Sequence, residues 1–139
     1  MGAIKIFTED ISHKIAFPVK TRRWIKSIVE SEGFLPGVIN YILCSDEYLL
    51  EMNKQYLDHD YYTDILTFDN SEAENEIEGD IFISLERVHE NAVIESVSPD
   101  DELRRVLAHG VLHLCGYDDH SPEDKINMRK REDYYLSLF

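Results

Sequence analysis

The stretch from Ser98 to Gly116 constrains the fold more than any other part of this sequence. It opens with a capping serine, then Pro99 at the first helical position and acidic residues behind it, which together favour a helix start. Gly116 stands where a helix end favours glycine. The apolar residues between these signals cover most of the helix circumference: Leu103, Val106, Leu107, Val111, Leu112 and Leu114. Such a helix is buried, so the sequence predicts a central helix here.

Two histidines interrupt this apolar helix. His109 and His113 are four residues apart, so they share one helix face, with Cβ atoms about 5–6 Å apart. Both rings could therefore reach a single zinc ion at about 2.0–2.1 Å. A histidine pair near a helix C-terminus can also simply interact with the helix dipole. The dipole alone does not explain why polar groups stand in the most apolar helix, so the pattern favours a metal site.

A third ligand is expected just after the helix, where Asp119 and His120 are the candidates. Asp119 occupies the register in which the H-x-x-x-H-x-x-G-x-x-H zinc pattern places its last histidine, and a carboxylate can bind zinc. His120 is the alternative because imidazole suits zinc better than carboxylate does. We favour Asp119, because the next helix starts at residues 121–122 and leaves the chain little slack.

The residue after the first histidine argues against one class of zinc enzyme. Peptidases with the H-E-x-x-H motif need a glutamate there as the general base, and this chain has Gly110. A site with three protein ligands still suits other metal-assisted hydrolysis, because the open position can hold a water.

The whole chain predicts one α+β domain over residues 1–139. We expect about four strands in a mixed sheet, at residues 4–7, 38–44, 64–68 and 81–83, with a turn at Pro36-Gly37. We expect five helices, at residues 21–32, 45–55, 84–95, 98–116 and 121–137, as a layer on one face of the sheet. Residues 69–78 are acidic and predict a loop or a wide hairpin connection. The strands on either side of it are expected to be antiparallel, because no helix fits between them.

Three blocks of this sequence, in this order, resemble the YbeY family of bacterial metal-dependent endoribonucleases that act in ribosomal RNA maturation. They are residues 53–56 with 63–68 (NKQY and TDILTF), residues 79–83 (GDIFI) and residues 109–118 (HGVLHLCGYD). Met128, Arg131 and Glu132 of the last helix are also similar to the family. The resemblance implies an α+β fold and a zinc ion held by His109, His113 and either Asp119 or His120. It also implies that a zinc-activated water attacks a phosphodiester of a ribosomal RNA precursor.

The sequence departs from the family pattern at two positions. Asp119 stands where the family usually has a histidine, and Leu57 stands where it usually has an arginine thought to contact RNA or phosphate. His59 could supply the missing cation or hydrogen bond, or it could be an ordinary exposed loop histidine. The strength of nuclease activity depends on which of these holds.

The expected catalytic residues are His59, Asp64 and Asp118. Asp64, like Thr63 and Asp80, could orient the histidines or could simply begin a strand. Asp118 could be the general base or a turn residue after the helix.

We therefore expect a metal-dependent endoribonuclease directed at single strands and involved in ribosomal RNA processing and ribosome maturation. Two alternatives stay open: a zinc hydrolase with another substrate, and a non-catalytic ribosome-assembly factor with structural zinc. The expected partners are RNA and the ribosome, with no membrane and no DNA. Cys44 and Cys115 lie in apolar runs, which favours free thiols in the reducing cytoplasm.

The charge is strongly acidic, with a net charge of −14 from 28 acidic and 14 basic residues. Phosphate backbones repel such a chain at long range, which argues against a general nucleic-acid binder. The charges are polarised, however, because residues 1–26 are basic and residues 69–102 are acidic. Arg22, Arg23 and Lys26 are therefore candidates for RNA backbone contacts. Three tyrosines could stack on unpaired bases, although we expect at least one in the core: Tyr56, Tyr61 and Tyr62.

Overall fold

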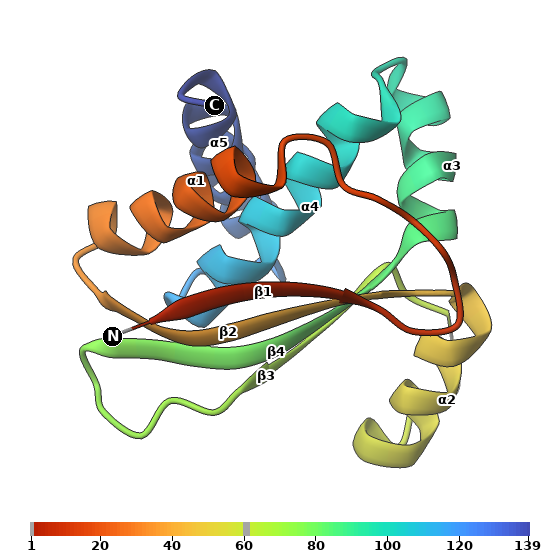
Figure 1. Cartoon of the computed structure of the whole chain (residues 1–139), viewed down its shortest axis with the longest axis horizontal. Coiled ribbons are helices and arrows are strands. Elements are labelled where there is room, and N and C mark those ends of the chain that lie inside the picture. Colours follow the sequence, from red (N-terminus) through yellow and green to blue (C-terminus); the bar gives the residue numbers. More distant parts are fainter. Residues whose placement is uncertain (1, 60–61) are drawn as a thin grey trace.

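The computed structural model describes residues 2–59 and 62–139, which form a four-stranded sheet and five helices (Figure 1). The strands are β1 (Ala3–Thr8), β2 (Leu35–Cys44), β3 (Ile65–Asp69) and β4 (Glu76–Ser84). The helices are α1 (Pro18–Ser31), α2 (Asp46–Leu57), α3 (Leu85–Glu95), α4 (Pro99–Leu114) and α5 (Pro122–Ser137). The predicted α+β class and the number of elements are confirmed.

The sheet is mixed, with strand order β1-β2-β4-β3. Strands β1, β2 and β4 are parallel, and β3 runs antiparallel to β4 at the edge of the sheet, as predicted. Ile81 pairs with Tyr41 on one side and with Thr67 on the other. Residues on β4 alternate between faces, so Ile77, Ile81 and Ile83 are buried under the helices.

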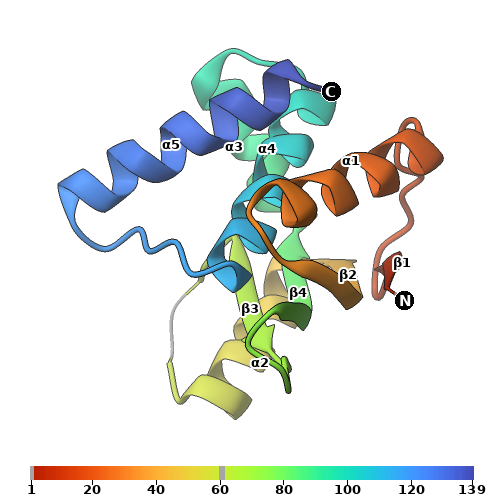
Figure 2. The same ribbon diagram turned by 90° about the vertical axis from the view of Figure 1, so that its left-hand side faces the viewer.

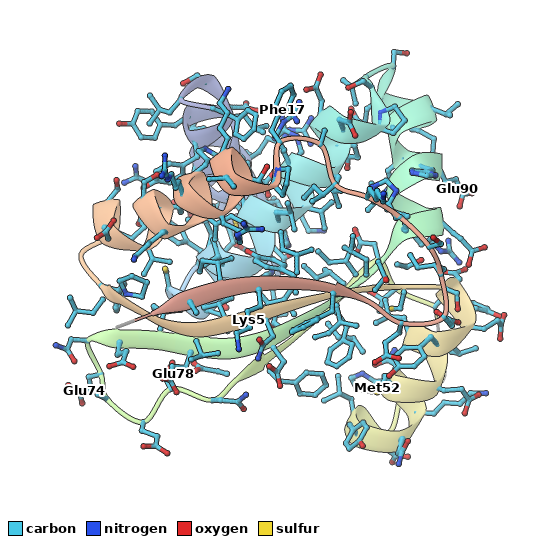
Figure 3. The ribbon with its side chains drawn as sticks, in the orientation of Figure 1. Lys5, Phe17, Met52, Glu74, Glu78 and Glu90 are labelled. Atoms are coloured by element: carbon cyan, nitrogen blue, oxygen red, sulfur yellow. The ribbon has the colours of Figure 1, made fainter. Side chains whose placement is uncertain are left out.

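The helices lie on both faces of the sheet, and not on one face as predicted. Figure 1 shows α1, α3, α4 and α5 on one face and α2 at one end of the opposite face. Helix α2 builds a second small core around Leu49, which packs with Cys44 and Leu66, and partly buried Met52 of the same helix packs against it (Figure 3). Within the described residues, none of the helices is long and apolar enough to cross a membrane.

Helix α4 is central, as its apolar pattern predicts. It is capped by Ser98, whose side chain accepts a hydrogen bond from the backbone N–H of Asp101, and it packs against α1, α3, α5 and the sheet. Gly110 faces β4 so closely that a Cβ there would lie 2.9 Å from Cγ2 of Ile81. A glycine after the first histidine therefore has a packing reason, because it lets the helix approach the sheet.

Three predicted boundaries are wrong. Helix α1 begins at Pro18 and not at Thr21, whose hydroxyl lies buried inside the helix and donates to the carbonyl of Phe17 at 2.8 Å. Pro36-Gly37 is no turn but belongs to β2, where the pairing with β4 shifts register. Strand β4 begins at Glu76, inside the acidic stretch expected to be a loop. At Pro36-Gly37 and at Glu76, pairing between distant strands outweighs the local signal, whereas α1 begins early because Pro18 occupies its first turn, where proline is favoured.

Candidate metal centre

Helix α4 holds the two histidines side by side, as their spacing predicts. The Nε2 atoms of His109 and His113 lie 2.9 Å apart, and both side chains are about one-fifth exposed. They face the edge strand β3, and Ile65 and Thr67 line the same hollow as the two rings.

The turn after α4 brings Asp119 back to the histidines. The helix ends at Leu114, and Gly116 adopts a φ of 107°, a left-handed conformation that favours glycine. Asp119 Oδ2 then lies 3.4 Å from Nε2 of His109 and 3.5 Å from Nε2 of His113. One ligand atom from each of these three residues lies within 4.8 Å of the others.

A buried carboxylate orients the first histidine. Nδ1 of His109 lies 2.6 Å from Oε2 of Glu132, whose side chain is only 5% exposed. The other oxygen of Glu132 accepts a hydrogen bond from Arg105 at 3.0 Å, so the buried carboxylate is paired. A carboxylate only accepts, so Nδ1 carries the proton and Nε2 of the neutral ring keeps its lone pair.

A backbone carbonyl orients the second histidine in the same way. Nδ1 of His113 lies 2.9 Å from the carbonyl oxygen of Tyr117, which can only accept a hydrogen bond. Both histidines therefore turn an unprotonated Nε2 toward Asp119 when they are neutral. Three acceptor atoms that converge in this way repel one another unless a cation or a proton lies between them.

The surroundings of His109 favour positive charge in the absence of a metal. Burial by itself lowers the pKa of His109, but the hydrogen bond and charge of Glu132, together with the charges of Asp119 and Asp64, outweigh it. The net effect raises the pKa of His109 above its ordinary value. The site thus attracts a cation electrostatically.

Two hollows meet at the histidines. One, of about 380 Å³, is lined by Thr63, Asp64, Ile65, Thr67, His109, His113, Asp119 and His120. A second, of about 340 Å³, shares Asp64, His109 and Asp119 and extends between α3 and α5. Asp64 lines both hollows, and exposed His120 lies at the first, outside the ligand triad.

The structure does not bring the other two predicted catalytic residues to this site. Asp118 is exposed and lines a separate hollow with Tyr117 and Arg131. His59 is exposed after α2, where its backbone N–H donates to the carbonyl of Asn53, and it lines neither hollow beside the histidines. Leu57 is the last residue of α2 and is 39% exposed.

The remaining residues singled out from the sequence lie away from the histidines. Asp80 faces the opposite side of the sheet, where it accepts a hydrogen bond from Asn40 at 2.9 Å. Tyr56 is 59% exposed, and Tyr62 is 45% exposed with its hydroxyl donating to Glu47, so neither is a core residue. The prediction for Tyr61 lies outside the described residues.

The predicted basic patch lies on α1, and Arg22, Arg23 and Lys26 line neither hollow beside the histidines. Arg23 and Lys26 are exposed, and Figure 2 shows α1 and the loop between α4 and α5 on opposite sides of α4. The cations that line the second hollow are Arg105, Lys125 and Arg129. No local pattern in the sequence signals this role, because it depends on how α5 packs beside α4.

The contact of Glu132 with His109 was not predicted from the sequence, although Glu132 is one of the residues similar to the family. Glu132 is 23 residues from His109 in the chain, so no local spacing signals their contact. The one available signal is helix periodicity, which places Glu132 on the same face of α5 as Met128 and Tyr135, the buried face.

The three donor atoms fit a small divalent ion. Ligands arranged tetrahedrally at about 2.0–2.2 Å from an ion lie about 3.3–3.6 Å from one another. The two nitrogen–oxygen distances at the site fall in this range, and the shorter nitrogen–nitrogen distance needs only a small outward shift. The fold and the site therefore define an α+β domain with a three-ligand metal site that opens onto a hollow, the arrangement of a metal-dependent hydrolase.

Comparison with known proteins identifies the family. The model of the family described as Endoribonuclease YbeY matches residues 5–139, so this chain belongs to the YbeY family. Its relatives include the Endoribonuclease YbeY of Cytophaga hutchinsonii, 52% identical over 97% of this chain and 94% of that protein. Another is that of Parabacteroides distasonis, 45% identical over 98% of this chain and 95% of that protein.

The fold is also similar to a solved structure. The solution structure of a protein from Thermotoga maritima matches with a TM-score of 0.67 and 29% identity. The match covers 97% of this chain and 87% of that chain.

Proposed function

We propose that this chain is a zinc-dependent endoribonuclease whose metal is held by His109, His113 and Asp119. The observation that carries the proposal is the convergence of three acceptor atoms, 2.9 to 3.5 Å apart, on an open hollow. Two imidazoles favour zinc over the harder ions, and one carboxylate is compatible with it. His120 lines the hollow without joining the triad, which supports Asp119 as the third ligand.

Three protein ligands favour a catalytic site over a structural one. A structural zinc site has four protein ligands, whereas the cluster found among the described residues has three. When bound, zinc would lower the pKa of a water molecule and stabilise the charge that develops on a phosphodiester.

The protein's own groups would then orient the reactants and move protons. Glu132 and the carbonyl of Tyr117 hold the histidine rings in the productive tautomer. We assign proton abstraction to Asp64 in preference to Asp118 or His59, because Asp64 lines both hollows beside His109. His120 is exposed at the hollow that also contains Thr63 and Thr67, and it is the candidate to protonate the departing oxygen.

We propose single-stranded ribosomal RNA precursors as the substrate and the cytoplasm as the location. The family's role in ribosomal RNA maturation supports the substrate, and exposed Tyr56 and Tyr62 could stack on unpaired bases. The proposed unit is the whole domain, residues 1–139, acting on RNA at the ribosome, without a membrane or DNA.

The test combines metal analysis with RNA cleavage. We expect the purified protein to hold about one zinc per chain and to cleave a single-stranded RNA, but not the DNA of the same sequence. A chelator should stop cleavage and zinc should restore it. The variant H109A/H113A should lose both metal and activity.

The alternatives predict other outcomes. Cleavage that persists in the H109A/H113A variant would place the active site elsewhere. A tightly bound zinc without cleavage of any RNA would favour the assembly factor or another substrate.

A further inference from the structure

Tyr117 is the residue through which the ligand loop is attached to the rest of the protein. Its backbone N–H donates to the carbonyl of Leu112 at 3.1 Å, and its own carbonyl accepts from Nδ1 of His113. Its hydroxyl donates to Oε1 of Glu32 at 2.7 Å and accepts from Nε of Arg131 at 2.9 Å. Every polar group of Tyr117 is therefore used, and Asp119 follows only two residues later.

The turn before Tyr117 is tied to the end of α4, where the backbone N–H of Gly116 donates to the carbonyl of His113 at 3.0 Å. A Cβ added at Gly116 would have no atom within 4 Å, so no side-chain packing holds the loop at this point. The next side-chain anchor after Tyr117 is Ser121, which caps α5 together with Asp124. The position of Asp119 thus depends on the tyrosine anchor on one side and on the helix cap on the other.

The anchor itself is set by a carboxylate from α1. Glu32 stands at the C-terminal cap of α1, and its side chain is only 8% exposed. One of its oxygens accepts from Tyr117 and the other from the hydroxyl of Tyr135 on α5. Arg131 lies 3.9 Å from the same carboxylate and supplies the balancing charge.

We propose that Glu32 is a positioning residue for the metal centre and acts through Tyr117. By holding the tyrosine ring, it holds the carbonyl that orients His113 and the loop that presents Asp119. The inference rests on the metal site proposed above. Loss of the contact loosens one histidine and the carboxylate ligand together, so metal affinity falls although no ligand is changed.

The two tyrosines bound to Glu32 provide a matched pair of variants. Tyr117→Phe removes a hydroxyl from the loop that carries Asp119. Tyr135→Phe removes a hydroxyl on α5 that bonds to Glu32 and not to a metal ligand. Both variants lose a partly buried hydrogen bond to the same carboxylate, and Tyr117→Phe also loses the hydrogen bond from Arg131, so both are expected to lose stability, Tyr117→Phe at least as much. Metal affinity is expected to fall by about tenfold or more only in Tyr117→Phe, the loss typical of groups that orient ligands.

The readouts are metal affinity, the visible spectrum of the cobalt(II)-loaded protein and thermal unfolding of the metal-free protein. We expect a changed cobalt spectrum in Tyr117→Phe and a wild-type spectrum in Tyr135→Phe, although both variants lose thermal stability. Glu32→Gln serves as a second variant, because an amide has one acceptor oxygen for two hydroxyls. It should also lower metal affinity.

Two results would overturn the inference, and they can be told apart from failure of the site. Equal metal affinity and equal cobalt spectra in the two tyrosine variants would overturn it, as would wild-type affinity in Glu32→Gln. If the H109A/H113A variant binds metal as tightly as the wild type, the site itself is wrong and the inference is overturned with it.

Discussion

The proton on each histidine ring decides whether this site can bind a metal. Glu132 and the Tyr117 carbonyl both accept hydrogen bonds, so both Nδ1 atoms are protonated and both Nε2 atoms face Asp119. A change in either hydrogen-bond partner leaves all three ligands in the chain but alters the tautomer and orientation of a histidine ring. The site can therefore be perturbed from outside the set of ligands.

Glu132→Gln tests this dependence at the first histidine. The amide has the size of the carboxylate but no charge, and it can offer its N–H₂ to His109 and so favour the wrong tautomer. We expect metal affinity to fall about 10- to 100-fold, as for other groups that orient metal ligands. A competition titration with a zinc-binding dye measures it.

Asp133→Asn is the matched control, because Asp133 is the exposed partner of the same Arg105 at 2.6 Å. It should keep wild-type metal affinity. An equal loss in both variants would mean that Arg105, and not the orientation of His109, carries the effect.

The raised pKa of His109 predicts how stability depends on pH. A proton that binds more tightly in the folded chain stabilises the metal-free protein below the unfolded pKa of about 6.5. That contribution is lost as pH rises through the raised pKa of folded His109. Metal binds the unprotonated ring, so stabilisation by zinc should instead grow over the same range.

Thermal unfolding with and without zinc, between about pH 5.5 and 8.5, measures both trends around the ordinary histidine pKa. His89→Ala, which removes an exposed histidine elsewhere, should leave the dependence unchanged. A zinc-induced shift that is constant across this range would contradict the assignment to His109.

At the scale of elements, the distance between α4 and the sheet is set by Gly110. A Cβ there would lie 2.9 Å from Cγ2 of Ile81 and 3.1 Å from Cδ1 of Ile65. A side chain at this position would push α4 away from β3 and β4. Because His109 is the adjacent residue in the helix, it would move with it. The same contact therefore links packing to the site.

Gly110→Ala separates two opposing effects. Helix propensity alone would stabilise the protein by about 1 kcal/mol. Overpacking against β4 is expected to cost about 1–3 kcal/mol, so we expect net destabilisation and weaker metal binding. Urea unfolding of the metal-free protein gives the sign, and a stabilised variant would show that the sheet yields freely.

At the scale of the whole molecule, the acidic charge limits how RNA can be held. A net charge of −14 leaves few cations to replace counterions on a phosphate backbone. We expect roughly three or four phosphate contacts, and hence a slope of log binding constant against log salt near −2 to −3. Binding to a single-stranded RNA in chelator, over a range of salt, measures the slope, and a slope for about ten contacts would contradict it.

Charge reversal locates these contacts on the surface. Reversing Arg22 and Arg23 should weaken RNA binding and leave metal content unchanged, since neither is a ligand or lines a hollow beside the histidines. Lys125→Glu should weaken binding more than either single reversal on α1, because Lys125 lines a hollow shared with His109. Wild-type binding in the α1 variants would make that patch ordinary surface.

Features that depend on neighbours along the chain could be predicted from the sequence. The capped, apolar helix with histidines four residues apart predicted both the central position of α4 and the facing imidazoles. The short turn after Gly116 predicted that Asp119 is the nearer of the two candidate ligands, which the geometry supports. These features are local because helix periodicity and turn stiffness act over a few residues.

The distant groups that complete the site come together only in the folded chain. Glu132 reaches His109 from α5, Glu32 reaches Tyr117 from the C-cap of α1, and Asp64 lies directly before the edge strand β3. The strand at Pro36-Gly37 and the early start of β4 were likewise decided by pairing between segments far apart in sequence. Such contacts leave no periodic signal, because the free energy that selects them comes from burial and pairing that exist only once the chain has folded.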